Sequence, residues 1–173
     1  MASASDDSKV KTTYTQHASW VVGLECVTLD TMASCSGDGT IIIWSISNGT
    51  TLKTINAGGG VYALQMLPSG LLASGDMSGQ IKYWNIVSGA LAPTLNKNTD
   101  WVTNLCLVNG KMLASSSQDS TVRLWDVRTG APIRVLSGYT NWVYGLKTIY
   151  PTSIASASLD KTIKIWDYLK NEN

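Results

Sequence analysis

The sequence has a single histidine, His17, and few charged side chains. One histidine excludes a His-rich metal site. Charged residues make up 14% of the chain, whereas about a quarter is usual in soluble proteins, so serine, threonine, asparagine and glycine supply most of the polarity. The net charge is +1, with lysine and arginine scattered along the chain. The sequence therefore lacks the basic patch of a nucleic-acid-binding protein.

Long apolar runs and a secretory signal are also missing. No stretch approaches the roughly 18 apolar residues of a membrane-spanning helix. Residues 1–9 are polar and acidic, and we predict a disordered segment there, unlike a secretory signal. We therefore expect a cytoplasmic protein, with the nucleus as the alternative compartment, that binds neither membranes nor nucleic acids. The three cysteines have no CxxC spacing and are predicted to be reduced, buried thiols: Cys26, Cys35 and Cys106.

What the sequence does contain is a tryptophan repeat. Four tryptophans recur at intervals of 40, 41 and 41 residues: Trp44, Trp84, Trp125 and Trp166. A second series keeps the same step: Trp20, Trp101 and Trp142, with Gly60 in the remaining place. A fixed period of about 40 to 45 residues is typical of a ring or array whose units cannot bury their faces alone. At 173 residues the chain has the length of one domain.

Each repeat is predicted to form four antiparallel strands. In the third repeat, the β-rich stretches are residues 101–108, 111–117, 121–127 and 131–136, separated by polar turns. No helical period is present, so the fold is predicted to be all-β. Four-stranded sheets packed face to face around an axis would cover the apolar faces that an isolated sheet leaves wet.

Three runs carry a family resemblance. Residues 113–126 (LASSSQDSTVRLWD), 154–167 (IASASLDKTIKIWD) and 32–44 (MASCSGDGTIIIW) resemble the signature of WD-repeat β-propellers, and the similarity extends over nearly all of the chain after residue 9. The resemblance implies a β-propeller of four-stranded antiparallel blades, with four blades per chain. We expect residues 10–173 to form the propeller domain, with repeats at about 17–56, 57–97, 98–138 and 139–173.

The resemblance also implies a hydrogen-bonded set of His, Ser, Asp and Trp in each repeat. The first repeat has all four: His17, Ser36, Asp38 and Trp44. The third and fourth replace His with Asn98 and Tyr139, and keep Ser117, Asp119, Trp125 and Ser158, Asp160, Trp166. The second has Ala57, Asp76, Ser78 and Trp84, with Ser and Asp exchanged. Because the set recurs, whereas an active site needs to occur once, we interpret these residues as structural.

The ring is predicted to close through the N-terminal segment. The last repeat stops after its third strand, and residues 10–16 precede the first repeat at the spacing of an outer strand. The resemblance implies that this segment supplies the missing outer strand. We favour two chains that exchange these strands and form one eight-bladed ring. The alternatives are a compact four-bladed monomer and a half-ring that needs a different partner.

The resemblance places partner contacts where the loops leading to the inner strands meet the turns that carry Asp. The predicted contact residues are Trp20, Val22, Tyr62, Met77, Trp101, Thr103, Gln118, Trp142, Tyr144, Leu159 and Lys161, with Gly37 and Gly60 at equivalent positions. Tryptophan and tyrosine are common interface anchors, although core packing is the alternative interpretation for each tryptophan. We predict that residues 58–60, three glycines, form a low, mobile rim that either opens room for a ligand or is a tolerated loop.

The function predicted from these features is a non-catalytic scaffold that binds a protein or peptide, without cofactor or metal. An enzyme such as a hydrolase is the first alternative, but the sequence has no paired carboxylates at useful positions and no phosphate-binding glycine loop beside a helix. A sugar-binding ring is the second alternative, since tryptophans also stack on sugars.

Overall fold

The computed structural model describes residues 12–92, 95–96, 100–149 and 152–169, and these residues form strands, turns and loops without a helix. Accordingly, no helix in this part of the chain could span a membrane. Blade 1 contains β1 (Val21–Cys26), β2 (Thr31–Ser36), β3 (Thr40–Ser45) and β4 (Thr51–Asn56). Blade 2 contains β5 (Val61–Met66), β6 (Leu71–Asp76), β7 (Gln80–Asn85) and β8 (Leu95–Asn96). Blade 3 contains β9 (Val102–Val108), β10 (Met112–Ser117), β11 (Val122–Asp126) and β12 (Pro132–Leu136), and blade 4 contains β13 (Val143–Ile149), β14 (Ser153–Ser158) and β15 (Ile163–Asp167).

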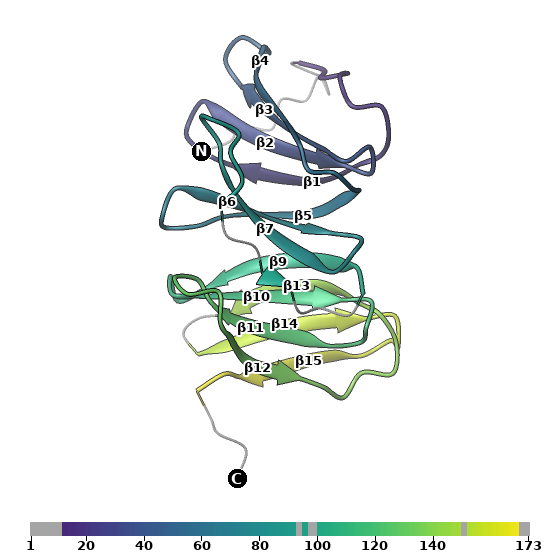
Figure 1. Cartoon of the computed structure of the whole chain (residues 1–173). Helices are drawn as coiled ribbons and strands as arrows, with labels where there is room; N and C mark the ends of the chain where they lie inside the picture. The colour runs from purple at the N-terminus through teal and green to yellow at the C-terminus, as the bar shows by residue number, and fades with distance from the viewer. Residues whose placement is uncertain (1–11, 93–94, 97–99, 150–151, 170–173) are drawn as a thin grey trace, which may run out of the picture.

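Each blade is an antiparallel meander in which consecutive strands pair. The first strands of successive blades, β1, β5, β9 and β13, lie next to one another, so they form the inner side of the assembly. Blade 1 lies at one end of the molecule, blade 2 lies next to it, and blades 3 and 4 overlap at the other end in this view (Figure 1). The predicted all-β fold with four propeller blades per chain is therefore confirmed.

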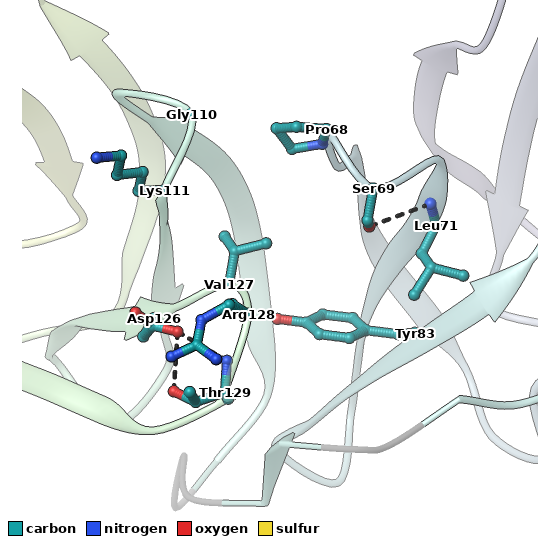
Figure 2. Close-up of a pocket in the computed structure, with 11 residues that line it drawn as sticks. Pro68, Ser69, Leu71, Tyr83, Gly110, Lys111, Asp126, Val127, Arg128 and Thr129 are labelled. Carbon is teal, nitrogen blue, oxygen red and sulfur yellow. Dashed lines mark hydrogen bonds between the residues drawn. The ribbon is translucent and has the colours of Figure 1, made fainter.

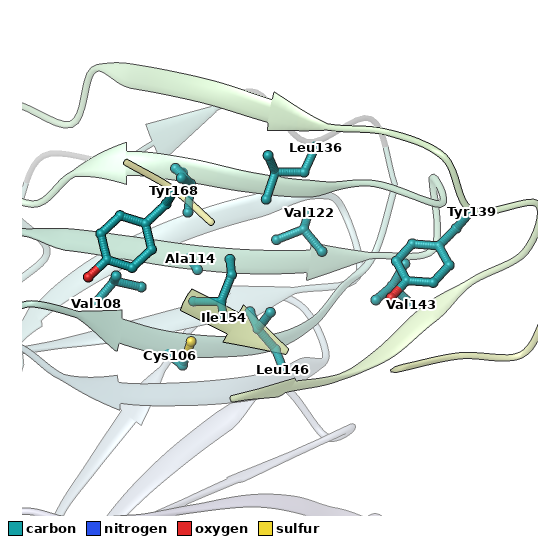
Figure 3. Close-up of a cluster of buried hydrophobic side chains, with 11 residues drawn as sticks. Cys106, Val108, Ala114, Val122, Leu136, Tyr139, Val143, Leu146, Ile154 and Tyr168 are labelled. Carbon is teal, nitrogen blue, oxygen red and sulfur yellow. The ribbon is translucent and has the colours of Figure 1, made fainter. Parts of the chain in front are cut away.

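The core lies between the blades rather than inside any of them. One buried cluster joins blades 1 and 2, a second joins blades 2 and 3, and a third joins blades 3 and 4. Figure 3 shows the third cluster, in which Val122 of β11 and Val143 and Ile154 of blade 4 point into one interface. Because side chains alternate between the faces of a strand, each blade contributes to the clusters on both sides.

The ring is open within a single chain. Blades 1 and 4 lie at opposite ends of the stack (Figure 1), and among the described residues no buried cluster joins them. Residues 12–16 form no strand and contact blade 1 instead of β15. The Tyr14 ring packs edge-on against Trp44, with ring centroids 4.8 Å apart. Residues 12–16 thus do not form the predicted outer strand on blade 4 of the same chain, and residues 10 and 11 of that prediction lie outside the described part. The single chain is therefore not the compact closed four-bladed monomer.

The cysteines differ from the prediction at one position. Cys35 and Cys106 are free and buried, but Cys26 is exposed. Cys26 lies on β1, the inner strand of the first blade, and no preceding blade covers it. Its burial therefore depends on a neighbour that the single chain does not supply.

Candidate functional site

One backbone hydrogen bond, repeated in all four blades, ties each loop before an inner strand to the turn after the second strand. The bonds are Gly37 N to Trp20 O (3.0 Å), Met77 N to Gly60 O (3.1 Å), Gln118 N to Trp101 O (3.0 Å) and Leu159 N to Trp142 O (2.9 Å). The predicted loop and turn positions therefore meet pairwise at one end of every blade.

A β-bulge re-aims a second set of predicted contact residues. In each blade the pairing between the first and second strands skips one residue: Val22, Tyr62, Thr103 and Tyr144. A bulged residue is left out of the ladder, and its side chain takes a direction that regular pleating does not give. Two of these side chains, Tyr62 and Tyr144, lie next to loop tryptophans.

Aromatic side chains gather at this end of the blades. The rings of Tyr62 and Trp101 lie 5.0 Å apart between blades 2 and 3, and those of Trp142 and Tyr144 lie 6.2 Å apart on blade 4. Trp20 is exposed over 77% of its surface. We call the surface formed by Trp20, Tyr62, Trp101, Trp142 and Tyr144 the aromatic face. Four further predicted contacts, Val22, Met77, Leu159 and Lys161, are also exposed.

Two predicted contact residues have internal partners. The Thr103 hydroxyl donates to the Val143 carbonyl of the next blade and lies 2.9 Å from the Ser116 hydroxyl. Gln118 Nε2 lies 3.4 Å from the Tyr144 hydroxyl and donates to it. Thr103 thus joins blades 3 and 4, whereas Gln118 positions an exposed aromatic ring.

The glycine rim is partly filled. Gly60 is buried, and a side chain there would begin 3.2 Å from both the Met77 sulfur and the Tyr62 ring. The space left by the missing tryptophan is therefore occupied by Met77 and Tyr62, so Gly60 does not open room for a ligand. Gly58, with φ of +82°, has nothing within 4 Å of its missing side chain.

The serine that bonds to each repeat tryptophan lies earlier in the sequence than the serine predicted for the hydrogen-bonded set, by two residues in blades 1, 3 and 4 and by four in blade 2. Each repeat tryptophan donates from Nε1 to a buried serine: Trp44 to Ser34 (2.7 Å), Trp84 to Ser74 (2.7 Å), Trp125 to Ser115 (2.9 Å) and Trp166 to Ser156 (2.7 Å). Ser36, Ser78, Ser117 and Ser158 are therefore not the partners of the tryptophan indoles. Residues two apart share a strand face, so both serines face the same way, but Ser36, Ser117 and Ser158 accept the backbone N–H of the turn aspartates at 3.0 to 3.1 Å.

His17 completes this set in blade 1. Its Nε2 lies 2.7 Å from Ser34 Oγ, and its Nδ1 lies 3.2 Å from an Asp38 carboxylate oxygen. A carboxylate only accepts, so Nδ1 donates to Asp38, while Nε2 is within hydrogen-bond distance of the Ser34 hydroxyl. Burial opposes ionisation of Asp38, but hydrogen bonds from Thr40, Ala18 and His17 outweigh it and hold the pKa of Asp38 well below its ordinary value.

The order Ser34, His17, Asp38 has the contacts of a catalytic triad, but its environment is structural. Ser34 is buried and its oxygen already accepts the Trp44 N–H. A catalytic serine must instead be accessible to a substrate, and hydrogen-bond donors nearby must stabilise the oxyanion that its attack produces. The same Trp–Ser bond in all four blades supports the structural interpretation.

The other blades replace the histidine in different ways. In blade 4 the Tyr139 hydroxyl lies 2.7 Å from Ser156 Oγ and accepts the Lys164 N–H at 3.1 Å. In blade 2 the Lys82 ammonium bonds to the Ala57 carbonyl (2.8 Å) and to Asp76 (3.0 Å). Asn98 of blade 3 lies outside the described residues. Tyr139 therefore substitutes for the imidazole.

A pocket of about 760 Å³ lies between blades 2 and 3 at the end opposite the aromatic face. It is formed by turns of two repeats, and the Tyr83 hydroxyl points into it (Figure 2). This hydroxyl is buried and has no hydrogen-bond partner among the described residues. Burial, and secondarily the charge of Asp126, raise the pKa of Tyr83 to about 12. Nothing in the sequence pattern predicted this pocket, because residues from separate turns line it. No cluster of three or more metal-binding side chains occurs in the described part of the chain.

Known proteins place this architecture in a family. The family model for the WD domain, G-beta repeat, matches residues 8–45, 89–126 and 130–167. These stretches make up well over half of the chain, so the chain belongs to the WD-repeat family. The first three strands of blade 2 lie between the first two matched stretches, and blade 2 is the blade whose His, Ser and Asp positions depart furthest from the pattern. No curated protein sequence matches the chain.

Solved structures show the same fold. The computationally designed Ika4 protein has a TM-score of 0.78 at 27% identity, over 90% of this chain and 95% of that chain. The designed Ika8 protein has a TM-score of 0.76 at 28% identity, over 87% of this chain and 46% of that one. The RRP9 WD40 repeats have a TM-score of 0.82 at 26% identity, over 88% of this chain and 49% of that one. The chain thus spans about half the length of Ika8 and RRP9.

Proposed function

We propose that the chain is a non-catalytic interaction scaffold whose aromatic face binds a protein or peptide segment. The observation that carries this proposal is the position of the five aromatic side chains on adjacent loops and bulges at one end of the blades. Such rings bury much area at little conformational cost and are enriched among the residues that dominate interface energies. The predicted contacts Val22, Met77, Leu159 and Lys161 extend this surface.

The chemistry of the face favours an extended segment with apolar and basic side chains. Lys161 is the only ionisable group among the predicted contacts other than the tyrosines. Aromatic rings attract cations over their faces, so an arginine or lysine of the partner can stack there. We propose that the protein acts inside the cell without cofactor, metal, nucleic acid or membrane.

A peptide selection tests the proposal. Peptides selected from a random display library on the folded protein should bind the wild type, and their affinity for the Trp101→Ala, Trp142→Ala double variant should fall at least tenfold. A matched control is the Leu29→Ala, Val87→Ala variant, because both side chains are exposed in turns at the opposite end of the blades. Circular dichroism verifies that both variants fold. Equal affinities for the two variants would exclude the aromatic face as the binding site.

The two alternatives have distinct tests. A hydrolase would cleave activated esters, and the rate would vanish in Ser34→Ala. A sugar-binding ring would retain glycans on an array in a manner that depends on Trp142. The hydrolase result is not expected, because Ser34 is buried and bonded to Trp44.

A further inference from the structure

Blade 1 exposes apolar side chains at positions that are buried in every other blade. Val21 of β1 is 52% exposed, whereas its counterparts are 0% exposed: Val61, Val102 and Val143. Leu24 is 67% exposed, whereas its counterparts are at most 7% exposed: Leu64, Leu105 and Leu146. Each buried counterpart is covered by the preceding blade. Blade 1 therefore has the face that a preceding blade normally covers.

Blade 4 exposes the opposite half of the same interface. Ile163 of β15 is 73% exposed, whereas its counterparts are 0% exposed: Ile41, Ile81 and Val122. Ile165 is 68% exposed, whereas its counterparts are at most 5% exposed: Ile43, Tyr83 and Leu124. These counterparts are covered by the blade that follows.

The two open faces fit each other. In the cluster between blades 1 and 2, Ile41 and Ile43 of the third strand pack with Val61 and Leu64 of the next inner strand. The side chains left uncovered, Ile163 and Ile165 at one end and Val21 and Leu24 at the other, are the two halves of this same contact. We propose that a second copy of this chain docks head to tail at both ends and closes one ring of eight blades. Two four-bladed copies related by a two-fold axis close the ring, and eight blades lie within the known propeller range of about 4 to 8.

Polar contacts at the blade boundaries support this pairing. Glu25 accepts the Met66 N–H (2.7 Å), Gln65 accepts the Leu107 N–H (3.0 Å), and Cys106 Sγ lies 3.6 Å from Thr148 Oγ1. The next residue in this series is the exposed Lys147. At the closed boundary Lys147 faces Cys26 and Glu25 of the second copy. The opposite charges of Lys147 and Glu25 favour this register.

The N-terminal segment already lies where the outer strand of a preceding blade belongs. Between blades 1 and 2, Ile55 of the outer strand β4 is in the same cluster as Trp84. Tyr14 packs on the equivalent Trp44. A cavity of about 380 Å³ remains beside it, lined in part by Tyr14, Val21, Leu24 and Met32. The docked blade fills this cavity, and residues 12–16 come to lie along β15 of the second copy without leaving blade 1.

Closure also completes the aromatic face. Between blades 2 and 3 the bulged Tyr62 stacks on Trp101. The equivalent pair at the new boundary is Tyr144 and Trp20 of the second copy. Trp20 is thus exposed in the single chain because the tyrosine that would pack against it belongs to the second copy.

Solution mass tests the proposal directly. Sedimentation or native mass spectrometry of the 173-residue chain should give twice 18.6 kDa, with no larger species as concentration rises. The Ile163→Asp, Ile165→Asp variant should give the mass of one chain and keep its circular dichroism, since both side chains are exposed in the single chain. Val87→Asp, an exposed change away from both ends, should remain dimeric. A single-chain mass for the wild type at tens of micromolar, or masses that grow without limit, overturns the ring.

A cross-link tests the register independently of the variant's stability. Lys147→Cys should form an intermolecular disulfide with Cys26 under mild oxidation, because the equivalent Cys106 and Thr148 side chains are in contact. The disulfide should vanish when Cys26→Ser is added. Lys111→Cys, exposed and distant from both open ends, should not cross-link. A cross-link that survives Cys26→Ser overturns this pairing. Neither experiment involves the peptide ligand, so its outcome is separate from that of the proposed function.

Discussion

Replacing Ser34 with alanine should destabilise the protein more than replacing Ser36, although the two serines are two residues apart on β2. Ser34 Oγ accepts the indole N–H of the buried Trp44 and bonds to Nε2 of His17, both at 2.7 Å. Among the described residues, Ser36 Oγ accepts a single hydrogen bond, from the backbone N–H of Asp38 at 3.1 Å. A buried polar group left without a partner costs about 1–3 kcal/mol. Because Ser34→Ala affects two such groups, we expect a loss of about 2–4 kcal/mol, against about 0.5–1.5 kcal/mol for Ser36→Ala, whose single bond is at a half-buried turn.

Urea and thermal unfolding, followed by tryptophan fluorescence and far-UV circular dichroism, measure both variants. For a chain of this size each kcal/mol shifts Tm by about 2–4 °C, so Ser34→Ala should lower Tm by roughly 4–16 °C. All measurements need one protein concentration, because association shifts apparent stability. A Ser36→Ala variant that loses as much stability as Ser34→Ala would refute the assignment of the tryptophan's partner.

Two further predictions concern turns on the same side of the blades. Hydrogen bonds hold the pKa of Asp38 low in the folded state, so the stabilisation by its carboxylate is complete above the unfolded pKa of about 3.9 and is lost as pH falls through the folded value. In unfolding scans from pH 6 to pH 3, the difference in unfolding free energy between wild type and Asp38→Asn should therefore shrink as the pH falls. A constant difference would contradict this prediction. Ser120 has φ of 66° at the position where blade 2 has Gly79 with φ of 79°. Because left-handed backbone is costly for residues other than glycine, Ser120→Gly should raise the free energy of unfolding by about 0.5–1 kcal/mol and Gly79→Ser should lower it. Unfolding midpoints that move in the opposite directions would show that these turns carry no such strain.

The tryptophan spacing predicted the number and type of blades, because each tryptophan anchors one unit to its neighbour. The serine partners of the tryptophans were misplaced, by two residues in blades 1, 3 and 4 and by four in blade 2. Ser34 and Ser36 share one strand face and one residue type, and only the register, in which Met32 pairs with Trp44, brings Ser34 within reach of the indole.

Other features depend on what packs beyond the repeat. The bulges that turn Tyr62 and Tyr144 onto the aromatic face arise from the pairing register, and the alternation of residue types does not reveal them. Cys26 was predicted to be buried like Cys106, but its exposure is decided by the missing blade before β1. A periodic sequence therefore predicts the structure of each repeat well, but it does not predict what packs against the first and the last repeat.

The pairing of Tyr144 with Trp20 has a consequence for avidity. A two-fold ring carries this aromatic pair twice, at diametrically opposite points, and the Tyr62 and Trp101 pair twice as well. A ligand with two tandem motifs could then engage both halves at once, and its second contact would form at the high effective concentration set by the linker. Multivalent ligands whose linkers span the ring would be selected over single motifs, without any change in the individual contacts.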